Sequence, residues 1–145
     1  MRNIKLQRQR KTLVFVYGTL KRGHGNHVLL KDSEFLGPAL TVNKYIMYRS
    51  GIPFVSKSNE TSNIMGELYS VDELSLNYLD MLEGHPTWYR REEIPIDYIS
   101  NKGEIKQTDA WLYFNEQIPN NATVVKSGTY GREEKSILHE QKNKS

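Results

Sequence analysis

The sequence contains no cysteine, which excludes disulfide bonds and a thiol nucleophile. It also lacks any apolar run that approaches the ~20 residues of a membrane span. The short apolar run at Leu13–Tyr17 follows a basic N-terminus, but it is too short for a signal-peptide core and no small-residue cleavage site comes after it. We therefore expect a cytoplasmic protein. A chain of 145 residues can form one domain whose core needs neither disulfides nor a metal ion.

Several common catalytic motifs are also missing from the sequence. There is no Gly-Lys-Ser/Thr phosphate-binding loop and no Gly-x-Ser-x-Gly nucleophile elbow. Gly23-x-Gly25 lacks the following helix and the acidic residue of a dinucleotide-binding motif. His24 and His27 are three residues apart, but no third ligand lies near them in the sequence. We therefore predict no metal site.

The formal net charge of +3 raises the question of nucleic-acid binding. The excess of positive charge lies at the two ends of the chain, and no basic stripe with interleaved aromatic residues runs between them. We predict a basic N-terminal arm at 1–11, one domain at 12–131 and a polar C-terminal tail at 132–145. Nucleic-acid binding through the termini is the weaker alternative.

The order of the expected elements predicts an α+β domain, built as a strongly curved sheet or a small barrel. The expected strands are Leu13–Tyr17, Glu34–Leu36, Ala39–Tyr48, Phe54–Val55, Ile64–Tyr69, Arg90–Ile99 and Thr108–Phe114, followed by an extended piece at Val124–Tyr130. Gly37-Pro38 predicts a bend or a break between two strands. Short additional helices are expected at His27–Lys31 and Arg132–His139.

One main helix is expected between Ser70 and Glu83. Ser70 and Glu73 match a capping box at its start, and Gly84 followed by Pro86 matches a helix end. Apolar residues recur at helical spacing and predict the buried face: Val71, Leu74, Tyr78, Leu79 and Leu82.

The first buried strand ends at Gly18, and the residues after it are small or polar. Backbone N–H groups at Tyr17, Gly18, Thr19 and Leu20 would then point into one space without a strand partner, and a carboxylate or oxyanion could bind them. The alternative is a tight turn whose N–H groups bond the neighbouring chain.

Glu83 is the candidate acid/base because it stands at the last position of the main helix. The negative end of the helix dipole disfavours a charged carboxylate there. Burial among Leu79, Leu82 and Trp88 would raise its pKa toward neutrality, where it can exchange protons. The alternative is that Glu83 points to solvent. Tyr17, Tyr89, Tyr113 and Tyr130 are candidate pocket walls.

An ordered set of short motifs resembles the γ-glutamylcyclotransferase-like family, which includes the γ-glutamylamine cyclotransferases. The motifs are Tyr17-Gly18-Thr19-Leu20, Gly66-Glu67-Leu68-Tyr69, Leu79-Asp80-Met81-Leu82-Glu83-Gly84, Tyr89-Arg90-Arg91, Ala110-Trp111-Leu112-Tyr113 and Ser127-Gly128-Thr129-Tyr130. In the last motif, threonine follows the glycine where an acidic residue is common. The resemblance covers about residues 13–131. It implies a small mixed barrel with helices outside, no metal or organic cofactor, and Glu83 as the acid/base.

The resemblance also implies a reaction. A γ-glutamyl amide would be cleaved by its own α-amine, which releases 5-oxoproline and a free amine or amino acid. We expect Tyr17, Gly18, Thr19, Leu20, Gly51, Ile52, Pro53, Tyr89 and Tyr113 to bind this small-molecule substrate. The alternative is a non-catalytic ligand-binding or regulatory domain on the same scaffold. Neither the amine nor the oligomeric state follows from the sequence.

Overall fold

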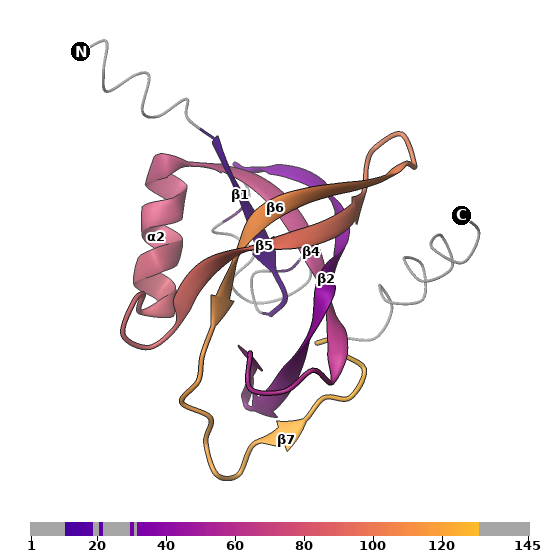
Figure 1. Ribbon diagram of the computed structural model, residues 1–145. Helices are drawn as coiled ribbons and strands as arrows, with labels where there is room; N and C mark the ends of the chain where they lie inside the picture. Colours follow the sequence, from indigo (N-terminus) through magenta and orange to yellow (C-terminus); the bar gives the residue numbers. More distant parts are fainter. Residues whose placement is uncertain (1–10, 19–20, 22–29, 31, 131–145) are drawn as a thin grey trace.

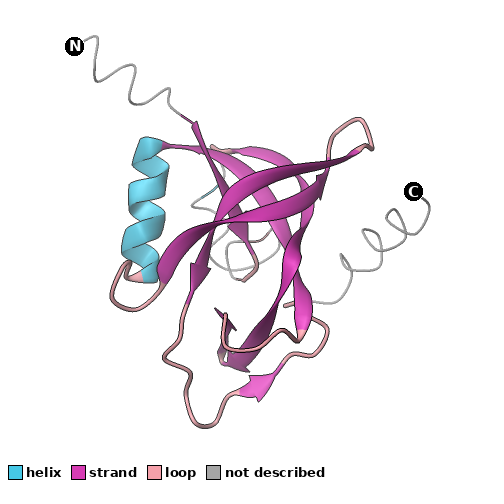
Figure 2. Ribbon diagram, in the orientation of Figure 1, coloured by secondary structure: helices cyan, strands magenta, loops and turns pink. Residues whose placement is uncertain are grey.

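The computed structural model describes residues 11–18, 21, 30 and 32–130. Figures 1 and 2 show a closed arrangement of strands with one helix, α2, along its side. The described elements are β1 (Lys11–Val16), β2 (Glu34–Ser50), β3 (Ile52–Ser56), β4 (Ser62–Asp72), α2 (Glu73–Glu83), β5 (Arg90–Ile99), β6 (Ile105–Phe114) and β7 (Thr123–Val124). The helices predicted at 27–31 and 132–139 fall almost wholly outside the described residues. No helix in the described part of the chain is long and apolar enough to cross a membrane.

Five of the strands close into a mixed barrel in the order β2-β4-β1-β6-β5 and back to β2. β1 pairs with β6 in parallel, at Val14 opposite Trp111, and the other pairings around the ring are antiparallel. The last joint is formed between β5 and β2, where Leu40 lies opposite Asp97. This arrangement confirms the predicted α+β fold and its barrel form.

β2 is one continuous strand of 17 residues, so the Gly37-Pro38 pair bends it rather than dividing it. Its register against β4 shifts between Phe35 and Gly37 and again between Leu40 and Lys44. Such irregularities bend and twist a strand, which allows one strand to take part in both ends of the closed ring.

The core has two layers because the barrel strands alternate their side chains. Phe15 and Tyr17 belong to a cluster drawn from all five barrel strands, which fills the interior. Val14 and Val16 belong to a second cluster that includes Leu76 and Leu79 of α2, so they face outward beneath the helix. This explains why the predicted first strand is buried on both faces.

The main helix differs from the prediction at its start. Asp72 is the N-cap, because its carboxylate accepts a hydrogen bond from the N–H of Ser75 at 2.7 Å, whereas Ser70 still belongs to β4. The strand runs directly into the helix, and an aspartate caps as well as a serine. Gly84 ends α2 in the left-handed conformation, with φ of 65°, as expected.

The predicted buried face of α2 was also wrong for three residues. Leu74, Tyr78 and Leu82 are 49%, 56% and 39% exposed, whereas Leu76 and Leu79 are buried. The helix carries two apolar stripes, and the shorter one packs on β1 and β4. Glu83 lies seven positions after Leu76 and four after Leu79. It is therefore on the same face of α2 as these two buried residues, the face that packs on the barrel.

Candidate active site

A pocket of about 190 Å³ lies where the end of β1, the start of β3 and the end of α2 meet. It is mainly apolar, and Glu83 is its only carboxylate among the described residues. Its lining consists of Phe15, Val16, Tyr17, Gly18, Ile52, Pro53, Leu82, Glu83, Trp88, Tyr89 and Tyr113. The fold therefore gathers side chains from four separate parts of the chain around one carboxyl group.

The environment of Glu83 favours its protonated form. The side chain is half-buried at the last position of α2, and no described residue forms a hydrogen bond with its carboxylate. Burial deprives the ionised form of hydration and raises the pKa of Glu83 from 4.5 to about 7. A carboxyl group with this pKa can accept and return a proton at physiological pH.

Three tyrosines form the polar part of the pocket wall. Tyr17 Oη donates to the Tyr113 carbonyl oxygen at 2.7 Å, and Tyr89 Oη donates to the Pro53 carbonyl oxygen at 3.0 Å. Burial is the main cause that raises the pKa of each of the three phenols, and the Glu83 carboxylate raises it further. All three hydroxyl groups are therefore neutral at physiological pH.

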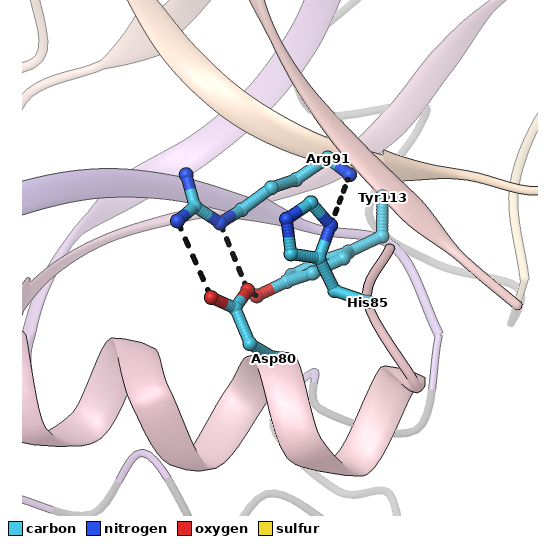
Figure 3. A network of polar contacts seen from close by, with 4 residues as sticks. All are labelled: Asp80, His85, Arg91 and Tyr113. Atoms are coloured by element: carbon cyan, nitrogen blue, oxygen red, sulfur yellow. Dashed lines mark hydrogen bonds and ion pairs between the residues drawn. The ribbon is translucent and has the colours of Figure 1, made fainter. Parts of the chain in front are cut away.

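Tyr113 belongs to a network of polar contacts behind the pocket (Figure 3). Its hydroxyl donates to Asp80 Oδ1 at 2.7 Å. Arg91 binds the same carboxylate through Nε at 2.8 Å and through Nη2 at 3.2 Å. The Arg91 guanidinium also lies over the Trp111 ring, 4.4 Å from its centroid, and the Arg91 backbone N–H donates to His85 Nδ1 at 3.2 Å. This network links α2 to β5 and β6.

The described geometry agrees with a family relationship. Residues 14–132 match the family model described as "Gamma-glutamyl cyclotransferase, AIG2-like". The chain belongs to this family. The match includes the second half of β1, all the later barrel strands and every residue that lines the pocket.

Similar proteins of this family occur in distant organisms. A Methanocaldococcus jannaschii protein named "Putative gamma-glutamylcyclotransferase MJ1514" is 45% identical over 118 residues, which span 81% of this chain and 93% of that protein. "Gamma-glutamylaminecyclotransferase B" of Danio rerio is 39% identical, and the alignment spans 70% of this chain and 58% of that protein. A crystal structure of an AIG2-like protein from Mus musculus has a TM-score of 0.73 at 27% identity, covering 85% of this chain and 90% of that one.

Six of the residues predicted from the family resemblance to bind substrate line the pocket with Glu83: Tyr17, Gly18, Ile52, Pro53, Tyr89 and Tyr113. Gly51 does not line the pocket. It forms the turn between β2 and β3, with φ of 76°, and this turn places Ile52 and Pro53 in the pocket wall. Thr19 and Leu20 lie outside the described residues, so the predicted anion site remains a prediction. Tyr130 is not part of the lining; its carbonyl oxygen accepts a hydrogen bond from Lys21 Nζ.

Gly18 is required for a reason other than backbone conformation. Its φ is not positive, so the turn does not need glycine for a left-handed backbone conformation. A Cβ atom on Gly18 would lie 2.7 Å from Pro53 Cγ, closer than real Cβ atoms come. The turn itself is closed by a hydrogen bond from the Lys21 N–H to the Gly18 carbonyl oxygen at 3.0 Å. In this family member, glycine lets two walls of the pocket touch.

Sequence reasoning gave no role to Asp80 or Arg91, although both lie within the family motifs. A helical spacing of three residues places Asp80 on the same side of α2 as Glu83, and this is the signal that could have identified it. No cluster of three or more metal-binding side chains forms within the described residues. His24 and His27 lie outside those residues, so the absence of a metal site remains a prediction.

Proposed function

We propose that the protein is a cyclotransferase that cleaves a γ-glutamyl amide and releases 5-oxoproline and a free amine. The observation that carries the proposal is a half-buried carboxyl group, Glu83, with a pKa of about 7 in a mainly apolar pocket of a γ-glutamyl cyclotransferase family member. Such a group is suited to taking up and returning a proton within one reaction cycle.

The reaction needs no nucleophile from the protein. Glu83 removes a proton from the α-ammonium group, and the resulting amine attacks the γ-carbonyl carbon to form a five-membered ring. Glu83 then gives that proton to the nitrogen of the leaving group as the carbon–nitrogen bond breaks. The ring nitrogen, which carries two hydrogens after the attack, loses the second one, and the leaving amine takes up this proton and departs as an ammonium group. The two products together contain all the atoms of the substrate, and no water is consumed.

The pocket contributes mainly by folding the substrate. Holding an amine against its own carbonyl carbon is worth up to about 7–11 kcal/mol in ideal cases. The apolar residues of the pocket wall that would restrict the conformation of the substrate are Ile52, Pro53, Leu82 and Trp88. We assign the substrate α-carboxylate or the reaction oxyanion to the backbone N–H groups of residues 17–20, because a buried strand ends there.

The experiment is a panel of γ-glutamyl compounds incubated with the protein, with 5-oxoproline measured by mass spectrometry. The panel includes γ-glutamylamines, because a Danio rerio relative is named for that activity. We expect Glu83→Gln to lower kcat by at least ~10²-fold, because both proton transfers are lost. Glu93→Gln is the control, since it removes one carboxylate from an exposed position of β5.

Activity of Glu83→Gln within a few-fold of the parent protein would remove Glu83 from the mechanism. Binding of γ-glutamyl compounds without any formation of 5-oxoproline would replace the proposal with the alternative of a non-catalytic ligand-binding domain. Loss of activity in both Glu83→Gln and Glu93→Gln would show that the assay reports stability rather than chemistry.

A further inference from the structure

Two carboxylates on the same side of α2 have opposite surroundings. Asp80 and Glu83 are three residues apart, which places them close together on the helix surface. Asp80 accepts hydrogen bonds from Tyr113 and twice from Arg91, whereas no described residue bonds the carboxylate of Glu83. Tyr113 joins the surroundings of both groups, because its hydroxyl donates to Asp80 and its side chain lines the pocket with Glu83. The carboxylate of Asp80 is therefore occupied by hydrogen bonds within the protein, whereas the carboxyl group of Glu83 is available to a ligand.

The contacts of Asp80 fix the direction of the Tyr113 hydroxyl group. Arg91 donates to both oxygens of Asp80, at 2.8 Å to Oδ1 and 3.2 Å to Oδ2, so this carboxylate acts as the acceptor of the network. The proton in the 2.7 Å contact must therefore belong to Tyr113. Tyr113 also lines the pocket, and with its proton bound by Asp80 its oxygen can act toward any further group only as an acceptor.

The other two phenols of the pocket are oriented in the same way. Tyr17 donates its hydroxyl proton to the carbonyl oxygen of Tyr113, and Tyr89 donates to that of Pro53. All three tyrosine hydroxyl protons in the lining are thus bound by acceptors of the protein. The Tyr113 oxygen together with the Glu83 carboxyl group is suited to a group that carries several N–H donors, and an ammonium group is of that kind.

We propose that Asp80 is a positioning residue that fixes the Tyr113 oxygen as a hydrogen-bond acceptor for the α-ammonium group of the substrate. This inference rests on the proposed function, which supplies the ammonium group. Arg91 supports Asp80 and is itself held by the face of the Trp111 ring. In Asp80→Asn, the amide can turn its oxygen to Arg91 and its NH₂ to Tyr113, so the Tyr113 proton is released toward the pocket.

The test compares two probes that differ only in the α-amino group, L-γ-glutamyl-p-nitroanilide and glutaryl-p-nitroanilide. Binding is measured by calorimetry in the Glu83→Gln background, where turnover is blocked. Three variants are made in it: Asp80→Asn, Tyr113→Phe and both together. Glu92→Gln is the matched control, because it breaks another 2.8 Å ion pair, with Lys57, at a partly exposed site outside the pocket lining.

We expect Asp80→Asn and Tyr113→Phe each to lower the preference for the amino probe by roughly tenfold or more, since each removes a hydrogen bond to a charged group. The double variant should lose no more than Tyr113→Phe alone, because Asp80 acts through Tyr113. Glu92→Gln should keep the full preference. Thermal melts of all variants separate a loss of preference from a loss of folding.

Penalties that add in the double variant, or an Asp80→Asn variant with reduced stability and unchanged preference, would overturn the inference. So would a Glu83→Gln protein that does not prefer the amino probe. If Asp80→Asn does not fold, Tyr113→Phe decides, and an unchanged preference in it also overturns the inference. Failure of the proposed function looks different: the parent protein then forms no 5-oxoproline, whatever the probe preference of the variants.

Discussion

Glu83→Gln is expected to make the protein more stable than its parent at neutral and alkaline pH, although it removes the proposed acid/base. In the folded protein the pKa of Glu83 is raised from 4.5 to about 7 by burial. Ionising this group therefore costs more in the folded state than in the unfolded chain. Glutamine has the shape of the protonated acid and never carries the charge.

The magnitude follows from the difference between the two pKa values. A change from 4.5 to about 7 corresponds to about 3 kcal/mol at about 1.4 kcal/mol for each tenfold change in proton affinity. Because Glu83 is only half-buried, solvent screening reduces this to roughly 1–3 kcal/mol. For a domain of this size, that corresponds to a difference in Tm of roughly 3–10 °C.

The stability difference between Glu83→Gln and the parent protein changes with pH. Below pH 4.5 the carboxyl group is protonated in both states, so the parent pays no penalty for its charge. Between pH 4.5 and about 7 the penalty grows, and above about 7 it is complete. The Tm of Glu83→Gln minus that of the parent should therefore rise across this interval and then stay constant.

The assay is thermal unfolding followed by circular dichroism from pH 4 to pH 9. Glu93→Gln is the control, because its side chain is exposed in β5 and its loss should not produce the same rise. A Tm difference for Glu83→Gln that is flat or falls with increasing pH would refute the reasoning about the buried carboxyl group.

Three further predictions concern the site and its supports. The value of kcat/KM should increase as the pH rises through about 7, because Glu83 must be ionised to accept the ammonium proton; a pH–rate profile with its bend below pH 5.5 would contradict this. Gly18→Ala should lower kcat/KM more than it lowers Tm, because the new methyl group meets Pro53, and a second change, Pro53→Ala, should restore part of the activity. Asp72→Ala should cost about 1 kcal/mol of stability through the lost helix cap, measured by urea unfolding, whereas Ser70→Ala should leave that cap intact.

Much of the fold could be predicted from the sequence, because the local strand and helix signals agreed with the element order that the family resemblance implied. The alternation in Arg90–Ile99 gave β5 with its correct limits, and Gly84 marked the end of α2. The order of elements left a curved sheet and a barrel open, and the family resemblance favoured the mixed barrel. Closure of the ring depends on Leu40 meeting Asp97, two residues far apart in the sequence.

The errors have physical causes. Ser70 and Asp72 are both good capping residues, and the choice between them was made by how far β4 continues in the ladder with β1. The two apolar stripes of α2 could not be ranked by periodicity, because packing on the barrel decides which one is buried. The contact between Gly18 and Pro53 and the network of Asp80 with Tyr113 join separate elements, so no spacing in the sequence reveals them.

The parallel pairing of β1 with β6 has a consequence for how the protein is made. Val14 lies opposite Trp111, so about a hundred residues separate the two sides of this joint in the chain. At a synthesis rate of about 5–20 residues per second, β1 leaves the ribosome roughly 5–20 s before the strand that completes it. Val14, Phe15 and Val16 have neither neighbouring strand until β4 is made, and from then on they still lack β6; Tyr17 has not yet met Tyr113. A nascent chain that stops before β6 therefore has an open sheet edge and lacks Tyr113, so the site is complete only after β6 has been made.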